Sequence, residues 1–473
     1  MDNIVASNTA TIENRTFDEI AAGDSASIVR TLTAADIELF AVVSGDINPS
    51  HLDSVYAKTD LFHRVVAHGM WGGGLISAVL GTKLPGPGTI YLSQYLQFHA
   101  AIGIGDTITT TVTAREKQVE RHQITFDCRC VNQAGHEVIT GVAEVRAPVE
   151  KLRQARMEPP DVQLARHRRF HDLLALATGK TPVPVAVAYP CDALSLSAVV
   201  EVADLGLVVP ILVGPAAIIR AAAVEANVDI GPLCLIDEPD AEAAALGAVA
   251  LVRAGEAALL MKGSLHTDVL MHAVVAAATG LRTERRLSHV FLMDVPSYPR
   301  PLLITDAAIN IAPTLEEKRD IVQNAIDLAH VMGIATPHVA ILAAVETVNP
   351  AMRSTLDAAA LCKMADRGQI TGGLVDGPLA FDNAVSADAA REKGISSLVA
   401  GYADILVVPD LEAGNMLAKQ LSFLAGADAA GVVVGARVPI ILTSRADSAR
   451  TRIASCAVAV LMARANPAHL QAA

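Results

Sequence analysis

One change of hydrophobic pattern within the first 150 residues restricts the fold more than any other feature. Residues 68–81 form an apolar, glycine-rich run without a polar face, and residues 89–146 then alternate polar and apolar side chains. A helix that is apolar all round has to be buried, whereas alternation with period two is typical of antiparallel strands. We therefore expect a helix from Met70 to Lys83 that lies inside a curved antiparallel sheet.

A rigid turn precedes this run. Thr33 is a typical N-cap, and the helix that it begins is expected to end at Gly45. Residues 46–53 follow as Asp-Ile-Asn-Pro-Ser-His-Leu-Asp, where the proline restricts its own backbone and that of the residue before it. Asp46 and His51 on such a loop could orient a water molecule and pass protons. The alternative is a turn in which Asp46 caps backbone groups and His51 is an ordinary surface residue.

Composition excludes several classes of partner and predicts a cytoplasmic protein. The 473 residues are too many for one core, and about 150 residues per domain suggests roughly three units. A net charge of -13 and an aromatic content of 3% argue against nucleic acid and anionic membranes as partners. The six cysteines form no Cys-x-x-Cys pair, which favours a reduced cytoplasmic setting over disulfides or structural zinc. No signal-peptide core and no membrane-spanning apolar run is found in the sequence.

From about Lys180 the pattern alternates short apolar strands with helices, starting with a strand at 183–188 and a helix at 198–205. This order predicts a parallel sheet. Three apolar stretches end in polar clusters, at 261–268, 304–310 and 440–448, and Arg282 lies between the first two. Ligands in open parallel sheets bind beyond the carboxyl ends of strands, so we expect one composite anion-binding cleft.

Two nucleotide motifs and one metal motif are not supported. Gly179-Lys180-Thr181 resembles the end of a phosphate-binding loop, but the required first glycine is replaced by Leu174. No Gly-x-Gly-x-x-Gly follows a strand, which argues against a decarboxylating dehydrogenase with a dinucleotide cofactor. His167 and His171 have metal-ligand spacing, but the neighbouring arginines favour a solvated helix face, and we expect no metal site.

The 46–53 string, the His68-Gly69-Met70 that follows and the strands behind them resemble the MaoC-like (R)-specific enoyl-CoA hydratases. The resemblance covers roughly residues 16–147. It implies a single hot-dog fold, a homodimer through this domain, and activation of water by Asp46 and His51 for addition to a 2-enoyl thioester. Gly69 would then lie at the helix N-terminus whose N–H polarises the thioester carbonyl. Asn48, inside the string, is expected to contact substrate.

Residues 175–473 resemble the phosphate acetyl/butyryltransferases. The likeness is carried by Gly-Leu-Arg-Thr at 280–283, Ser-His-Val-Phe at 288–291, residues 375–384, residues 409–415 and Thr-Ser-Arg-Ala-Asp-Ser at 443–448. It implies two α/β lobes of the isocitrate dehydrogenase-like type, with acyl-CoA and phosphate bound between them. Ser444 is expected to act on the thiol, and Asp447 is the nearest carboxylate to serve as base, because Thr451 stands where the acetyl branch has an aspartate. Met271 and His272 stand where that branch has an arginine.

The resemblances together predict an α+β hot-dog domain at 1–150, a linker at 151–172 and an α/β acyltransferase at 173–473. Its first lobe would comprise about 173–286 and 431–473, and its second lobe about 287–430. Substrate contacts in the acyltransferase are expected from Lys262, His266, Thr267, Arg282, Thr305, Asn310 and Arg445.

The predicted function is bifunctional: hydration of 2-enoyl-CoA and transfer of a short acyl group between CoA and phosphate, without a cofactor other than the CoA thioester. The alternative is an acyltransferase alone, with the hot-dog domain as a CoA-binding or dimerisation module. The expected partners are acyl-CoA, enoyl-CoA, phosphate and further copies of the chain, with no nucleic acid and no membrane.

Overall fold

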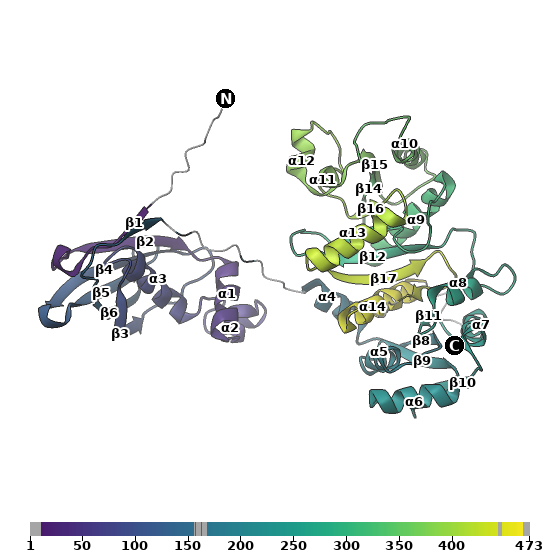
Figure 1. The fold of residues 1–473 in the computed structure, drawn as a ribbon, viewed down its shortest axis with the longest axis horizontal. Helices are drawn as coiled ribbons and strands as arrows, with labels where there is room; N and C mark the ends of the chain where they lie inside the picture. Colours follow the sequence, from purple (N-terminus) through teal and green to yellow (C-terminus); the bar gives the residue numbers. More distant parts are fainter. Residues whose placement is uncertain (1–10, 156, 158–161, 163–167, 443–446, 467–473) are drawn as a thin grey trace. The chain divides into compact units, whose positions relative to one another are not determined.

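The computed structural model describes residues 11–155, 157, 162, 168–442 and 447–466. The chain divides into two compact units, residues 1–164 and 165–473, and each is described by itself. Figure 1 shows the first unit in purple and blue and the second in teal to yellow.

The first unit is an antiparallel sheet curved around one long helix, as the sequence predicts. The sheet has the strand order β2-β4-β5-β6-β3. Its strands are β2 (Ser25–Thr31), β3 (Ile90–Phe98), β4 (Thr107–Gln118), β5 (Gln123–Val131) and β6 (Glu137–Arg146). The helix is α3 (Gly69–Thr82), and its apolar residues form one core with those of the sheet. The expected helix from Met70 to Lys83 is therefore confirmed to within one residue at each end.

Glycines allow α3 to lie very close to the sheet. A Cβ atom on Gly72 would lie 2.3 Å from Ile139 Cδ1, and a Cβ atom on Gly141 of β6 would lie 2.1 Å from the carbonyl oxygen of Tyr95. Both positions exclude a side chain unless their neighbours move. The glycine run that weakens an isolated helix is therefore what allows this packing.

Short helices lead the chain to the N-terminal end of α3. The helix α1 (Ala34–Ser44) begins with a capping box between Thr33 and Asp36 and ends at Gly45, whose φ is 74°, as expected. The four-residue helix α2 (Pro49–Leu52) follows directly. The remaining short elements of this unit are η1 (Phe17–Glu19), η2 (Tyr56–Lys58), η3 (Val119–Arg121), β1 (Thr11–Glu13) and β7 (Arg153–Ala155). The strands β1 and β7 pair with each other in an antiparallel ribbon.

The second unit is built on one sheet of eleven strands in the order β10-β9-β8-β11-β18-β17-β12-β13-β16-β14-β15. Its strands are β8 (Val183–Ala188), β9 (Val208–Gly214), β10 (Cys234–Asp237), β11 (Leu259–Lys262), β12 (Ser288–Asp294), β13 (Leu302–Thr305), β14 (His338–Leu342), β15 (Leu374–Leu379), β16 (Ile405–Val407), β17 (Asp428–Val434) and β18 (Ile440–Ile441).

Helices lie on both faces of this sheet (Figure 1). They are α4 (Arg168–Ala177), α5 (Ala193–Asp204), α6 (Ala216–Ala226), α7 (Ala241–Ala254), α8 (Thr267–Val275), α9 (Leu315–Val331), α10 (Arg353–Asp366), α11 (Phe381–Val385), α12 (Ala387–Glu392), α13 (Leu411–Leu424) and α14 (Ala449–Ala465). Several apolar residues of α14 and of the central strands are fully buried in the largest core. The α/β class is as predicted, whereas the isocitrate dehydrogenase-like description stays a prediction.

The sheet is mixed, which corrects the expectation of a parallel one. At one end of the sheet β10, β9, β8, β11 and β18 are parallel to one another. At the other end β13, β16, β14 and β15 are parallel to one another. Between these two groups, β17 and β12 are antiparallel to each other, β17 is antiparallel to β18, and β12 is antiparallel to β13. The strands β11 and β18 therefore end at one edge, and β13 ends at the opposite edge. The polar cluster at 304–310 therefore does not share a strand edge with the cluster at 261–268. The expected composite cleft of all three clusters stays a prediction.

Candidate functional site

Three side chains converge where α2 meets the N-terminal end of α3. One ligand-type atom from each of Asp46, His51 and His68 lies within 4.8 Å of the others. Asp46 is exposed, His51 is half-buried and His68 is 2% exposed. The turn expected to hold Asp46 and His51 does bring them together. It brings them to a histidine that the sequence reasoning did not select, although His68 stands directly before the glycine run.

Backbone carbonyls fix both imidazoles. His51 Nδ1 lies 2.9 Å from the carbonyl oxygen of Val66, and His68 Nε2 lies 3.0 Å from the carbonyl oxygen of Asp46. A carbonyl oxygen can only accept, so these two nitrogens donate. His51 Nε2 and His68 Nδ1 are thereby left with free lone pairs in the neutral rings. The ring centroids are 3.9 Å apart, so the two imidazoles are in contact.

The other predicted residues of this unit have backbone roles nearby. Gly69 is the first residue of α3, which places its N–H at the positive end of the helix dipole. The Asn48 side chain accepts a hydrogen bond of 3.1 Å from the Ser50 N–H and so caps α2. Asp46 Oδ1 in turn accepts a hydrogen bond from the Asn48 N–H at 3.2 Å. The capping alternative is therefore present together with the cluster and does not replace it.

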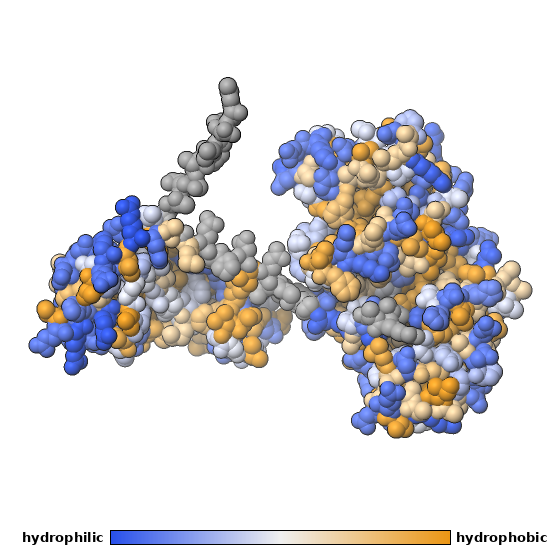
Figure 2. Space-filling view, viewed as in Figure 1, coloured by the Kyte–Doolittle hydropathy of each residue, from blue (hydrophilic) through white to orange (hydrophobic). Residues whose placement is uncertain are grey.

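Exposed apolar side chains surround this cluster. Figure 2 shows hydrophobic residues gathered on the face that α1 and α2 occupy. The exposed apolar residues of this stretch are Val42, Val43, Ile47, Leu52, Val55, Tyr56, Leu61 and Phe62. A patch of this kind at a polar cluster fits an apolar ligand or a protein partner.

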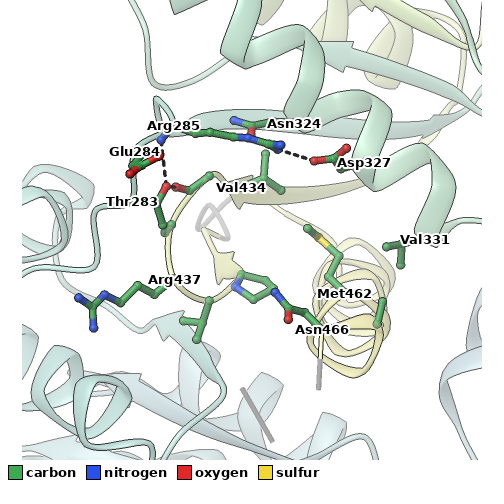
Figure 3. A pocket seen from close by; sticks show the side chains of 15 residues that line it. Thr283, Glu284, Arg285, Asn324, Asp327, Val331, Val434, Arg437, Met462 and Asn466 are labelled. Carbon is green, nitrogen blue, oxygen red and sulfur yellow. Dashed lines mark hydrogen bonds and ion pairs between the residues drawn. The ribbon is translucent and has the colours of Figure 1, made fainter. Parts of the chain in front are cut away.

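In the second unit, two adjoining cavities lie at the edge where β17 ends and β12 begins. The first, of about 600 Å³, lies between the 283–285 loop, the 435–439 loop and the C-terminal part of α14 (Figure 3). The second, of about 460 Å³, shares residues 283–285, and Ile309 also lines it. Helix α9 lines both cavities, the first with its C-terminal half and the second with its N-terminal turns. Arg282 lines the second cavity, is exposed, and has no ion pair or side-chain hydrogen bond with any residue the structure describes.

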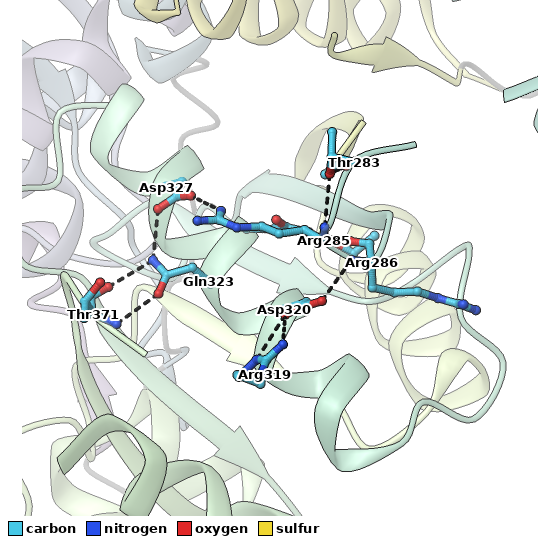
Figure 4. A network of polar contacts seen from close by, with 11 residues as sticks. Thr283, Arg285, Arg286, Arg319, Asp320, Gln323, Asp327 and Thr371 are labelled. Atoms are coloured by element: carbon cyan, nitrogen blue, oxygen red, sulfur yellow. Dashed lines mark hydrogen bonds and ion pairs between the residues drawn. The ribbon is translucent and has the colours of Figure 1, made fainter. Parts of the chain in front are cut away.

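Three of the other arginines around these cavities, Arg285, Arg286 and Arg319, are held by acidic partners, as Figure 4 shows for Arg285 and Arg319. Arg437 of the first cavity is exposed and forms no ion pair with the described residues. Arg285 pairs with Asp327, and Arg319 pairs with Asp320 at 2.8 Å. Gln323 then links Asp327 to the carbonyl oxygen of Thr371, with contacts of 3.0 and 3.1 Å. These ion pairs stabilise the loop and α9. Their positive charges are neutralised by the aspartates and are less available to bind an anion.

Three predicted substrate residues are buried and already bonded. Thr305 is fully buried and donates to the carbonyl oxygen of His289 at 2.9 Å. Asn310 bonds Asp306 Oδ2 at 2.5 Å and accepts from Arg286 Nε at 2.7 Å. Lys262 is 8% exposed, and its ammonium donates to two backbone carbonyl oxygens of the loop that follows β11. Their direct contact with substrate stays a prediction. Sequence reasoning missed Asp306 and Arg286, although Asp306 lies in the quoted 304–310 stretch.

The remaining predicted residues lie near the ends of β11 and β18. His266 and Thr267 are exposed at the start of α8. Asp447 is half-buried, and its carbonyl oxygen accepts from Arg452 at 2.5 Å. Ser444 and Arg445 lie outside the described residues. Lys262 is the last residue of β11 and Asp447 comes after β18, and these parallel neighbours end at the same edge.

A metal ion could be held by the two imidazoles and the carboxylate of the first unit, since this donor set suits divalent transition metals. His167 of the proposed helix pair lies outside the described residues. The expected absence of a metal site therefore stays a prediction. Within the part of the chain that the structure describes, no helix combines the length and apolarity needed to cross a membrane. All six cysteines are free thiols.

Two stretches of the chain match known families. Residues 239–460 match the family described as Phosphate acetyl/butaryl transferase, and residues 19–132 match the family described as MaoC like domain. A phosphate acetyltransferase of Rhizobium meliloti is 63% identical over 299 residues, which cover 63% of this chain and 95% of that protein. A phosphate butyryltransferase of Clostridium acetobutylicum is 42% identical and is covered to 98%, against 63% of this chain.

A solved structure agrees with the fold of the second unit. The branched-chain phosphotransacylase of Enterococcus faecalis is 31% identical, with a TM-score of 0.53, over 59% of this chain and 99% of that protein. The chain therefore joins a MaoC-like hot-dog domain to an α/β unit of the acyltransferase type within one polypeptide.

His289 of β12 should make the second unit sensitive to acid. Burial lowers the pKa of this histidine to about 4, although the neighbouring Asp306 carboxylate opposes the shift. Below pH 6.5 the unfolded chain takes up a proton here that the folded chain does not, so stability falls as the pH falls toward 4. The loss should be about 3 kcal/mol.

The His289→Gln variant lacks this proton, so between pH 7 and 4 its unfolding free energy should fall less than that of the wild type by this amount. Circular dichroism during denaturant unfolding measures both units, and fluorescence of Trp71, the only tryptophan, measures the first unit alone. Equal pH dependence in both proteins would contradict the assignment.

Proposed function

Because the chain belongs to the phosphate acetyl/butyryltransferase family, we propose that its second unit transfers a short acyl group between CoA and inorganic phosphate. The observation that carries this proposal is the 63% identity to a phosphate acetyltransferase over nearly that protein's full length. In this reaction a phosphate oxygen attacks the thioester carbonyl carbon, the C–S bond breaks, and the CoA thiolate leaves and takes up a proton. The products are an acyl phosphate and free CoA.

Charge is the main requirement of this reaction, because both substrates are anions. Arg282 suits the phosphate or the CoA, since its guanidinium is exposed and no acidic partner holds it among the described residues. By resemblance, Arg445 adds a second cation, Ser444 contacts the sulfur, and Asp447 exchanges the thiol proton. Asp306 and Asn310 support the proposal indirectly, since they hold the loop that follows β13, and Asn310 accepts a hydrogen bond from Arg286.

We also propose that the first unit hydrates a 2-enoyl thioester. The water oxygen bonds to C3, one water proton leaves to a base, and C2 receives a proton from an acid. Asp46 and His51 lie close enough to act together in these two steps. The N–H at Gly69 suits the negative charge that develops on the thioester oxygen, since it lies at the start of α3. The apolar surface around the cluster fits an acyl chain. Neither reaction requires a bound cofactor beyond the CoA thioester.

An acyltransferase with a non-catalytic hot-dog unit is the second candidate function. The exposed apolar face favours it, because such a face also suits dimerisation or CoA binding. Both candidates place the chain in the cytoplasm, where acyl-CoA is available.

Acyl transfer should be measured as phosphate-dependent CoA release from a panel of acyl-CoAs with two to six carbons. The Arg282→Ala variant should raise the KM for phosphate or CoA by about tenfold or more, since a charge-assisted hydrogen bond is lost. Arg220→Ala on α6 removes an exposed arginine elsewhere and serves as the matched control. No CoA release from any substrate of the panel would reject the proposed transfer.

Hydration should be followed by the loss of absorbance of crotonyl-CoA. The Asp46→Asn variant should be slower by about 10²–10⁴-fold, because it loses a proton-transfer group, while phosphate-dependent acyl transfer should be unchanged. Asp53→Asn changes a neighbouring exposed carboxylate that caps the Val55 and Tyr56 N–H groups, and should retain hydration. Wild-type protein that transfers acyl groups but hydrates no enoyl-CoA would favour the second candidate.

The edge strand β3 supports a homo-oligomer through the first unit. Ile90, Tyr95 and Phe98 on this strand are each more than half exposed, and the outer side of the strand is unpaired in the described chain. The Tyr95→Lys variant should therefore halve the assembly mass measured by sedimentation. Val119→Lys places the same charge at an exposed valine outside β3 and should not change it. A monomeric wild-type protein would refute the interface.

A further inference from the structure

His68 has a polar atom that neither proposed reaction uses. The side chain is 2% exposed, and its Nδ1 atom is buried without a hydrogen-bond partner among the described residues. Phe40 and His51 contact the ring, at centroid distances of 4.9 and 3.9 Å. A buried imidazole nitrogen normally has a partner, and leaving it without one destabilises the fold. The unpaired Nδ1 atom of His68 therefore calls for a functional explanation.

The hydrogen bond made by His68 Nε2 determines that Nδ1 carries a lone pair. His68 Nε2 donates to the Asp46 carbonyl oxygen, so Nδ1 of the neutral ring can only accept. Asp46, His51 and His68 each place one polar side-chain atom within 4.8 Å of the atoms from the other two, so a donor held among the three has to be small. A single water molecule bridges polar atoms up to about 5.6 Å apart, since each hydrogen bond spans about 2.8 Å. The separation in this cluster is well inside that limit.

We propose that His68 is a third water-binding residue of the hydration site, whose Nδ1 accepts a hydrogen bond from the water that adds to C3. This inference rests on the proposed hydratase function. The water donates one hydrogen bond to His68 and one to the base, which leaves an oxygen lone pair free to attack C3. His68 neither gains nor loses a proton and only orients the water. The base removes a proton from the water, and the acid delivers a proton to C2.

The proton inventory of the cluster supports this role. A carboxylate oxygen of Asp46, His51 Nε2 and His68 Nδ1 are all acceptors when the two rings are neutral, but a water has only two hydrogens. One of the three groups has to carry a proton for all three to bond one water. With His68 and the base as acceptors, the third group is the protonated one, and it can be the acid that delivers a proton to C2.

Two isosteric variants separate this role from a purely structural one. In His68→Asn the amide oxygen takes the place of Nδ1, and in His68→Gln the amide nitrogen takes the place of Nε2. If His68 binds the water, the Asn variant should retain hydration within about threefold, and the Gln variant should lose about 10–100-fold in kcat with the KM for crotonyl-CoA unchanged. If His68 only holds the Asp46 carbonyl, the order is reversed.

Trp71, on the first turn of α3, reports by fluorescence that each variant is folded, and acyl transfer by the second unit provides the internal reference. An Asn variant as slow as the Gln variant, or a Gln variant as fast as the wild type, overturns the inference.

A crystal structure of the wild-type protein provides a test that does not depend on turnover. An ordered water within about 3.2 Å of His68 Nδ1 and in contact with Asp46 or His51 is expected. Absence of this water rejects the inference, whether or not the wild type hydrates enoyl-CoA. Absence of hydration alone rejects only the proposed hydratase function.

Discussion

The close approach of α3 to its sheet determines the geometry of the first unit. Gly72 and Gly141 allow this contact, because any side chain at either position would collide with Ile139 or with the backbone at Tyr95. The helix is thereby fixed along the concave side of the sheet, and its N-terminal end is held where α2 arrives. The positive end of the helix dipole, an imidazole and a carboxylate meet at this point because the packing leaves the helix one position. A chemical site on a rigid element needs such a constraint.

The second unit depends on a different constraint, the reversal of strand direction at its centre. The strands β17 and β12 are antiparallel to each other and to their outer neighbours, so the two parallel halves of the sheet point in opposite directions. The halves therefore present their carboxyl ends on opposite edges. The loop after β13 is held in place by Asp306, which accepts from three backbone N–H groups, and by Asn310, which connects it to Arg286 just before β12. Groups that come from opposite halves must reach a common substrate from loops and helix ends.

Local signals predicted much of this architecture. The capping box at Thr33, the left-handed Gly45 and the alternation through β5 and β6 act over a few residues, and each appears at the expected position. Asp46 and His51 were predicted on one turn for the same reason, since Pro49 restricts the backbone between them. The direction of β12 could not be predicted, because alternating strands and helices do not specify the edge at which each connection ends.

His68 shows where sequence reasoning fails for the site itself. It is seventeen positions after His51, and only the packing of α3 brings the two rings into contact. Buried Thr305 shows the converse. A threonine at the end of an apolar strand is typical of a ligand-binding position, but here its hydroxyl completes a bond across the sheet to His289. Whether a polar side chain faces a cleft or the interior depends on strand pairing, which the local pattern does not contain.

The ribbon of β1 and β7 has a consequence for how this protein is put together. Thr11–Glu13 pairs with Arg153–Ala155, and Lys151 forms ion pairs with Glu13 and Glu19 beside it. The first unit is thus closed on itself at the point where the chain leaves it, so entry and exit are adjacent strands. A module of this kind can be attached to, or inserted into, another polypeptide without opening its own sheet. A fragment cut at residue 150 would leave β1 without its partner strand, so the transferable piece of the chain includes β7.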